Sequence, residues 1–392
     1  MTRALLHSAL MVIAALTAFA TPARAADPAA VITRLFTEPV SADWFTPAFL
    51  AQVPVPALTK IVTDLTTQFG AYQGIDPAGE KFLVHLKTAD VPTLIALTDG
   101  GQISGLFFRT PVPTNVSLAD QVAAIAALPG KTAVLVTKNG ATLAEHNSTM
   151  SLAVGSAAKL AILKALDDAV ATGKLTPEAI VKLSQRSLPS GMLQGWPPGT
   201  PMTIASLADL MISISDNTAT DTLIATLGRP AIEAVTPANT PFPMTSDMFK
   251  LKAKQNAALT EAWRNDSADA RRAVLDRLAD VPLPAVGDLT GTATADIEWF
   301  MPATELCTLL AATHTDDAFT INPGLADPAA WASVAFKGGA DSGVLNFSTY
   351  LVDKAGDAYC VVATWNNDAD LDQTRLTAPY TGILHALSTA AK

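Results

Sequence analysis

The chain has 392 residues, of which 49% are hydrophobic and 16% are charged, so it is long enough to form two domains with buried cores. Its formal net charge of −10 argues against a nucleic-acid partner, because binding to phosphates requires a basic surface. The low content of charged residues predicts helices that are deeply buried rather than covered with salt bridges.

Residues 1–25 have the features of a signal peptide. Arg3 gives a positive start, residues 9–19 are apolar, and Ala23-Arg24-Ala25 offers a cleavage pattern of small residues. The apolar stretch is short for a membrane-spanning helix. We therefore expect an exported protein, periplasmic or secreted after cleavage near Ala25. No later apolar run approaches spanning length, so no stable membrane span is expected in the mature chain.

Residues 27–113 are predicted to form a small α+β module. Ser41 is a candidate N-cap for a helix over 43–53, and the apolar stripe of residues 56–69 is typical of an amphipathic helix. Strand patterns then follow over 81–88, 93–97 and 103–109, and a glycine turn joins the last two. Helices packed on a small antiparallel sheet account for this order.

Residues 114–392 are predicted to form a second, larger domain, whose sheet is assembled from both ends of the segment. Asn139-Gly140 is typical of a hairpin turn, and three further strand patterns lie near the end of the chain. The middle is helical. The strands are expected over 132–137, 141–146, 333–337, 345–352 and 358–365, and the helices over 117–128, 156–172, 204–214, 218–227, 249–278, 302–312 and 378–391.

Ser156 and Lys159 are three residues apart at the start of a predicted helix, so their side chains share one face. A serine hydroxyl next to an amine that its surroundings hold neutral is a nucleophile with a base beside it. A Ser-x-x-Lys pattern alone occurs in almost any long chain. Two further motifs follow in order: Ser215-Asp216-Asn217 where one helix ends, and Lys337-Gly338-Gly339 at the end of a strand pattern.

In this order and topology, the three motifs resemble those of the active-site serine penicillin-recognising enzymes, which include class A β-lactamases and penicillin-binding proteins. The segment from Met202 to Ala219 also resembles the class A sequence around its second motif. The resemblance covers roughly residues 117–392. It implies a β-lactamase/transpeptidase-like domain, with an antiparallel sheet flanked by helices and an all-helical subdomain. The small module before this domain resembles that of the clavulanic-acid-cluster lactamase-like esterases, which implies a cystatin-like (steroid-isomerase-like) fold for 27–113.

The resemblance implies a role for each matching residue. Ser156 would be acylated and Lys159 would take its proton, although a glutamate-held water is the alternative base in the family. Ser215 would pass a proton to the leaving nitrogen, Asn217 would orient Lys159 and the substrate amide, and Lys337 would attract the substrate carboxylate. Asp216 is expected to turn inward and cap structure. The backbone N–H groups of Ser156 and Ala340 would form the oxyanion hole, and Gly338 and Gly339 would let a substrate lie against the strand.

Two features depart from the family pattern. Gly338 stands where a hydroxyl residue usually follows the lysine, and Ser342 is a candidate replacement, although an ordinary loop serine is an equal alternative. The Glu-x-x-Leu-Asn segment that activates the deacylating water in class A enzymes is missing. The region before Pro302 offers Asp288, Asp296 and Glu298 without that pattern. An acyl-enzyme would therefore form and then hydrolyse slowly.

The sequence thus predicts an exported serine hydrolase that acts on a β-lactam or a related amide or ester through acyl-Ser156. An esterase or D-amino-acid peptidase with the same site is one alternative, and a penicillin-binding sensor with slow turnover is another. The partner expected is a small-molecule substrate. No cofactor and no metal site are predicted, because the five histidines are scattered. Cys307 and Cys360 either form a disulfide or are two buried thiols.

Overall fold

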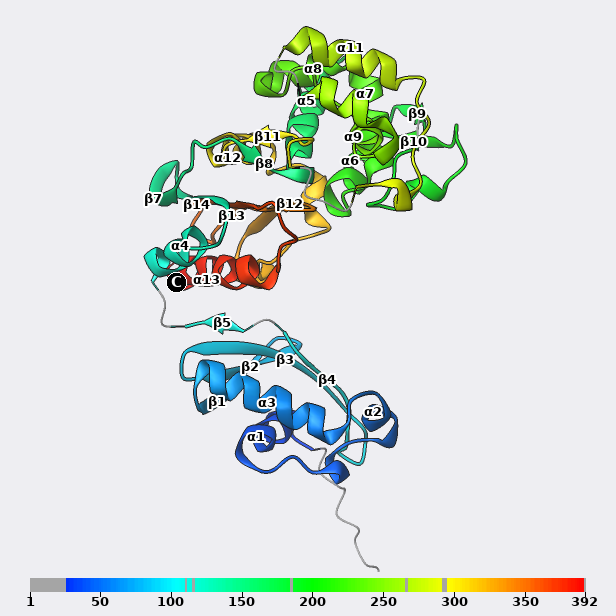
Figure 1. Ribbon diagram of the computed structural model, residues 1–392. Coiled ribbons are helices and arrows are strands. Elements are labelled where there is room, and N and C mark those ends of the chain that lie inside the picture. Colours follow the sequence, from blue (N-terminus) through cyan, green and yellow to red (C-terminus); the bar gives the residue numbers. More distant parts are fainter. Residues whose placement is uncertain are drawn as a thin grey trace, which may run out of the picture. The chain divides into compact units, whose positions relative to one another are not determined.

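The computed structural model describes residues 26–109, 111–114, 117–183, 186–264, 267–290 and 295–390 (Figure 1). The predicted signal peptide lies outside these residues. By the contacts among its residues, the chain divides into a smaller unit, Met1–Arg109, and a larger unit, Thr110–Lys392. Among the described residues, no helix combines the length and the apolar character that crossing a membrane requires.

The smaller unit is the α+β module expected from the sequence. Three helices precede an antiparallel sheet with the strand order β1-β2-β3-β4. Buried Ile32 of the first helix and Val84 and Val91 of the sheet share one apolar core. The elements are α1 (Pro28–Thr37), α2 (Pro47–Gln52), α3 (Val55–Phe69), β1 (Tyr72–Ala78), β2 (Lys81–Leu86), β3 (Ala89–Leu97) and β4 (Ile103–Phe108). Its predicted likeness to the cystatin fold stays a prediction.

Two local predictions in the smaller unit are wrong. The helix expected over 43–53 is a 3₁₀ turn (Ala42–Trp44) followed by α2, and Thr46 rather than Ser41 caps α2 by accepting from the backbone of Phe49. Pro47 at the first helical position fixes this start. Strand β1 was not predicted because Pro77 breaks the strand pattern. Proline is tolerated there because β1 is an edge strand of the sheet.

The larger unit is built on an antiparallel sheet of five strands in the order β12-β13-β14-β6-β7. The N-terminal hairpin and the three C-terminal strands meet in this sheet, as the sequence predicted. The bounds are β6 (Lys131–Lys138), β7 (Ala141–His146), β12 (Ser333–Asp341), β13 (Val344–Val352) and β14 (Ala358–Asn366). Short strands outside this sheet are β5 (Val112–Pro113), β8 (Leu152–Ala153), β9 (Ile180–Lys182), β10 (Pro201–Thr203) and β11 (Phe300–Met301).

Helices cover both faces of the five-stranded sheet. On one face Val134 and Val136 pack with α4 (Leu118–Ala126) and α13 (Thr374–Ala390). On the other face Leu135 packs with α5 (Lys159–Ala171) and α12 (Ala303–Thr313). Alternate residues of a strand point to opposite faces, which is why consecutive apolar residues of β6 are buried in different cores.

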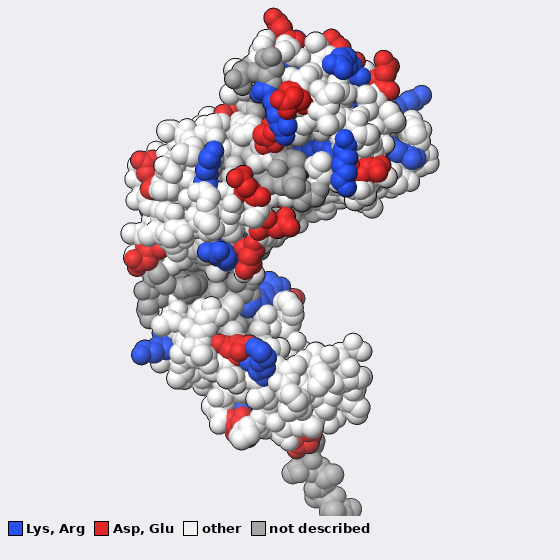
Figure 2. All heavy atoms as spheres, viewed as in Figure 1, with Lys and Arg blue, Asp and Glu red and all other residues white. Residues whose placement is uncertain are grey.

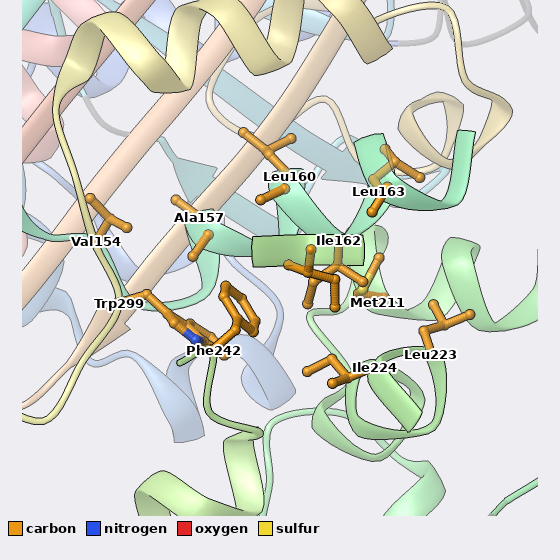
Figure 3. Packing of buried hydrophobic residues seen from close by; sticks show 14 of the residues in the cluster. Val154, Ala157, Leu160, Ile162, Leu163, Met211, Leu223, Ile224, Phe242 and Trp299 are labelled. Carbon is orange, nitrogen blue, oxygen red and sulfur yellow. The ribbon is translucent and has the colours of Figure 1, made fainter. Parts of the chain in front are cut away.

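The all-helical part surrounds α5, whose residues Lys159 to Leu163 are all buried. Figure 3 shows Leu160, Ile162 and Leu163 among apolar side chains from other elements, including Met211 and Trp299. The first half of α5 is therefore enclosed by its neighbours, which hold it rigidly. The helices of this part are α6 (Ile204–Ser213), α7 (Asn217–Leu227), α8 (Arg229–Val235), α9 (Thr245–Leu251), α10 (Ala257–Trp263) and α11 (Ala268–Leu278).

Cys307 of α12 and Cys360 of β14 form a disulfide, with 5.8 Å between their Cα atoms. The structure therefore decides between the two alternatives left open by the sequence. The bond joins a helix covalently to the central sheet and lies within the apolar core between them.

Charged side chains of both signs are interspersed over the face shown in Figure 2. Such a mixed surface on an acidic chain does not resemble the basic footprint that a nucleic acid requires.

Candidate active site

Ser156 lies on a single 3₁₀ turn, Gly155–Ala158, that leads directly into α5. The turn begins at Gly155, whose φ of +52° favours glycine, and a Cβ atom there would be 3.1 Å from the backbone nitrogen of Ala340. The segment before the turn is held because Val154 N–H donates to the carbonyl of Trp299. Ser156 therefore lies at a firmly held junction between strand β8 and helix α5.

Lys159 is fully buried at the first turn of α5. Its Nζ donates to the carbonyl oxygen of Ser215 at 2.7 Å, to Ser215 Oγ at 3.1 Å and to Asn217 Oδ1 at 2.7 Å. Burial lowers the pKa of Lys159 well below its usual value, and the charge of Lys337 lowers it further. Burial thus favours the neutral amine, which is the form able to accept a proton.

Ser215 connects the two lysines. Its Oγ lies 3.1 Å from Lys159 Nζ and 3.1 Å from Lys337 Nζ. Ser215 has a φ of +59°, in the left-handed region that few residues other than glycine adopt. Such strain persists only where the surroundings hold the residue firmly, and it is frequent at functional sites. Burial lowers the pKa of Lys337 to about 7, so this lysine changes charge near neutral pH.

Asp216 is buried and anchors the loop before the second motif, as predicted. Its Oδ1 caps α7 by accepting from Ala219 N–H at 2.9 Å, and its Oδ2 accepts from the backbone of Met192 and Leu193 at 2.6 and 2.8 Å. Asn217 is held in turn because its Nδ2 donates to the carbonyl of Leu188. The loop and helix α7 therefore fix the amide that contacts Lys159.

The third motif lies on β12, where Lys337 and Gly339 share one face because alternate residues of a strand point the same way. A Cβ atom on Gly339 would be 2.0 Å from the Val154 carbonyl oxygen and 2.7 Å from Ser156 N. Glycine here lets the strand pack against the Ser156 turn. A Cβ atom on Gly338 would contact the ring of Phe336 at 3.0 Å instead.

A pocket of about 270 Å³ opens beside Ser156. Of the predicted site residues, Ser156, Asn217 and Ala340 line it, and Lys159, Ser215 and Lys337 join them through the hydrogen bonds described above. The backbone groups proposed as the oxyanion hole therefore border the pocket. The lining residues are Gly155, Ser156, Pro189, Ser190, Asn217, Thr245, Met248, Phe249, Lys252, Glu298, Trp299, Ala340 and Asp341.

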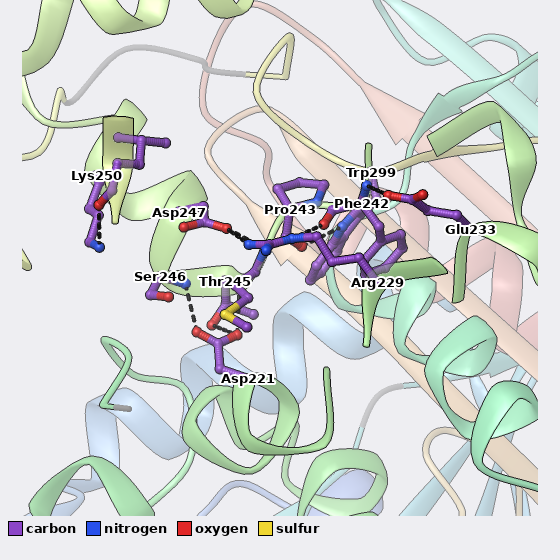
Figure 4. A network of polar contacts seen from close by, with 12 residues as sticks. Asp221, Arg229, Glu233, Phe242, Pro243, Thr245, Ser246, Asp247, Lys250 and Trp299 are labelled. Carbon is purple, nitrogen blue, oxygen red and sulfur yellow. Dashed lines mark hydrogen bonds and ion pairs between the residues drawn. The ribbon is translucent and has the colours of Figure 1, made fainter. Parts of the chain in front are cut away.

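The pocket wall from α9 was not recognised in the sequence as part of a site. Figure 4 shows how α9 is anchored: Asp221 accepts from the backbone of Thr245 and Ser246, and Arg229 contacts Asp247. These contacts fix the helix that brings Met248, Phe249 and Lys252 to the pocket. No short sequence motif predicts this wall of the pocket, because the contacts that position it join residues far apart in the chain. Asp341 could have been found, since it continues the alternation of Lys337 and Gly339.

Residues 117–279 match the sequence model of a family described as the β-lactamase enzyme family. The match lies within the larger unit, which is therefore similar in sequence to that family. No curated protein is similar in sequence to this chain.

Several solved structures are similar to part of this chain. A β-lactamase from Sphaerobacter thermophilus is 20% identical, with 70% of this chain and 96% of that chain covered and a TM-score of 0.45. The protein PBP-A is 15% identical, with 70% and 95% covered and a TM-score of 0.47. An ancestral class A β-lactamase is 17% identical, with 70% and 100% covered and a TM-score of 0.48.

The structure locates the residues of the two features that depart from the family pattern. Ser342 lies at the turn after β12, and its hydroxyl donates to Asp370 at 3.1 Å rather than lining the pocket. Among the three carboxylates considered before Pro302, Glu298 lines the pocket, and Asp341 lines it beside Glu298. The pocket therefore contains carboxyl groups, although the sequence lacks the segment that usually supplies one.

Proposed function

We propose that the protein is an exported serine hydrolase that acts on a β-lactam or a related amide or ester through an acyl-Ser156 intermediate. The observation that carries the proposal is the environment of Lys159, whose buried amine contacts both Ser215 and Asn217 beside the Ser156 turn. An amine that burial keeps neutral is the base that a serine nucleophile needs.

The proposed acylation proceeds as follows. Lys159 takes the proton of the Ser156 hydroxyl, and Oγ attacks the substrate carbonyl carbon. The N–H groups of Ser156 and Ala340 stabilise the resulting oxyanion, a contribution of a few kcal/mol in comparable sites. Ser215, which contacts Lys159 Nζ, passes the proton to the leaving nitrogen or oxygen as that bond breaks. The acyl group remains on Ser156, and water releases it in a second step.

Lys337 favours a substrate that carries a carboxylate next to the scissile bond. Its Nζ contacts Ser215 Oγ, which also contacts Lys159 Nζ. Because the pKa of Lys337 is about 7, part of this lysine is neutral near neutral pH. An approaching carboxylate stabilises the charged form. β-Lactams and peptides with a free terminus carry such a group, whereas simple esters do not.

The disulfide supports export, because such bonds persist in oxidising compartments. An esterase or D-amino-acid peptidase with the same site and a slow penicillin-binding sensor are the alternatives. They differ from a lactamase in the substrate that acylates Ser156 and in the lifetime of the adduct.

A chromogenic cephalosporin assay combined with intact-protein mass spectrometry tests the proposal on the wild type and on Ser156→Ala. We expect an adduct and hydrolysis that both depend on Ser156. Rapid turnover supports a lactamase, and a long-lived adduct supports the sensor. If neither β-lactams nor activated esters form an adduct that requires Ser156, the proposal is wrong.

A further inference from the structure

We propose that Glu298 and Asp341, joined by Lys252, act as a carboxyl pair that activates the water for hydrolysis of the acyl-Ser156 ester. The inference rests on the proposed function, because it concerns the second half of the same reaction. It gives the chain a deacylating group in place of the missing glutamate segment.

Glu298 reaches the pocket from the strand beside the Ser156 turn. Strand β11 pairs with β8 so that Phe300 lies opposite Ala153, and Trp299 accepts a hydrogen bond from Val154 N–H. Continuing this antiparallel register places Glu298 next to Gly155, the residue before Ser156. The indole of Trp299 donates to the Pro243 carbonyl, which fixes the chain at this point.

Asp341 reaches the pocket from the end of β12. It lies on the same face of β12 as Gly339, which packs directly on the backbone nitrogen of Ser156. Two residues of a strand rise about 7 Å, and Asp341 lines the same pocket as Ser156. Its side chain is 32% exposed, and Ser342 N–H donates to Oδ1 at 2.7 Å. Asp341 is therefore oriented and open to solvent.

Lys252 holds the two carboxyl groups together. Its Nζ donates to Glu298 Oε1 and, at 2.6 Å, to Asp341 Oδ2, and its side chain is only 6% exposed. Lys252 follows α9 directly, so the Asp221 contacts shown in Figure 4 also set its position. One ammonium group beside two carboxylates leaves one uncompensated negative charge, so the pair is able to take up one proton.

The electrostatics fit a base that works near neutral pH. Burial raises the pKa of Glu298 to about 7. The pKa of Asp341 is lowered instead, because the charge of Lys252 and hydrogen bonds outweigh the effect of its burial. The charged groups that face Glu298 are Lys252, Asp341 and, at longer range, Lys159. A carboxyl group whose pKa lies near the working pH is best suited to take a proton from water.

The proposed step balances as follows. A water molecule between the pair and the ester gives one proton to the pair while its oxygen bonds to the acyl carbon. The tetrahedral intermediate collapses, and the bond from that carbon to Ser156 Oγ breaks. The proton held by the pair is relayed to Oγ, which restores the serine hydroxyl. The product leaves as a carboxylic acid.

The test measures acylation and deacylation separately on the full chain with a chromogenic cephalosporin and an activated ester. The variants are Glu298→Gln and Asp341→Asn. Asp296→Asn is the matched control, because Asp296 lies two residues from Glu298 but pairs with Arg264 at the surface. We expect acylation rates within about twofold of the wild type and deacylation slowed by about 100-fold in both variants. Acyl-Ser156 then accumulates in intact-protein mass spectra, and the control does not accumulate it.

A merely structural role is separated by adding hydroxylamine, which attacks an ester without a general base. We expect it to release the adduct of both variants nearly as fast as that of the wild type. Normal deacylation by both variants overturns the inference. Slowed acylation with unchanged deacylation also overturns it, and so does a wild-type adduct that persists as long as the adducts of the two variants. If the wild type forms no Ser156 adduct at all, the proposed function itself fails, which is a distinct result.

Discussion

Lys159 Nζ lies 2.7 Å from Asn217 Oδ1, and this contact joins the helix that carries the candidate nucleophile to the start of α7. The amide carries no charge, so it orients the lysine and stabilises the ammonium form less than a carboxylate would. The pKa of Lys159 is therefore lowered by its burial and by Lys337 without a directly bonded carboxylate to raise it again.

Asn217→Asp tests this relationship. A carboxylate in contact with Lys159 raises the pKa of the lysine, so a smaller fraction of it is neutral at a given pH. We expect the acidic limb of the acylation pH profile to move by at least about one unit to higher pH. Asn217→Ala is the control, because it removes the same contact without adding charge. A profile that moves equally in both variants contradicts the prediction.

The charge of Lys337 predicts how substrate choice depends on pH. Its pKa of about 7 lies below that of an ordinary lysine, so the ammonium form is lost as pH rises above about 7. We expect kcat/KM for a carboxylate-bearing substrate to fall by roughly tenfold per pH unit well above that value. The rate for a matched ester without a carboxylate should not fall. The measurement is kcat/KM for both substrates from pH 6 to 9, and an equal fall for both rules out this role.

Gly339→Ala should prevent β12 from packing closely against the turn that carries Ser156. The added Cβ atom would lie 2.0 Å from the Val154 carbonyl oxygen, so the backbone around Ser156 must shift. Displacing reacting groups by about 1 Å costs on the order of 100-fold in rate, and we expect at least that loss of Ser156 acylation. Gly338→Ala is the matched control on the other face, with an expected loss below about tenfold. Comparable losses in the two variants would show that the close approach is unimportant.

The disulfide should contribute to stability rather than to chemistry. Cys307 and Cys360 are 53 residues apart, and a cross-link of this span restricts the unfolded chain. Replacing both cysteines by alanine should lower the free energy of unfolding by about 2–4 kcal/mol. Urea unfolding of the oxidised wild type and of the double variant measures the difference. Acylation by a β-lactam should be unchanged below the transition, and a loss of acylation in the folded variant would contradict this assignment.

Much of the fold could be predicted because its signals are local. Ser117 and Thr203 cap the helices that follow them, and Asn139-Gly140 forms the expected hairpin turn. The missed strand β1 contains Pro77, whose tolerance depends on lying at a sheet edge. An edge position is set by which strands pair, and no local pattern reveals it.

The three motifs of the candidate site were visible because each is a short run of residues with a defined chemistry. Lys252 was not visible, because it belongs to no such run, and Asp341 was overlooked although it continues the alternation of the third motif. Their contact joins the end of α9 to the end of β12, and Glu298 enters it from a third segment. Ser342 was considered because of its hydroxyl, yet the turn after β12 directs that hydroxyl to Asp370.

The sequence by itself determined the order of Ser156, Lys159, Ser215, Asn217 and Lys337, and the local structure that carries each of them. Residue type and short spacing are enough for that, because helices, caps and turns depend on neighbouring residues. Only the tertiary structure decided that Lys159 is buried beside Lys337, that Cys307 pairs with Cys360, and that Glu298 and Asp341 share Lys252. Burial and the distances between charges fix the protonation of such groups, and both arise only when distant segments pack together.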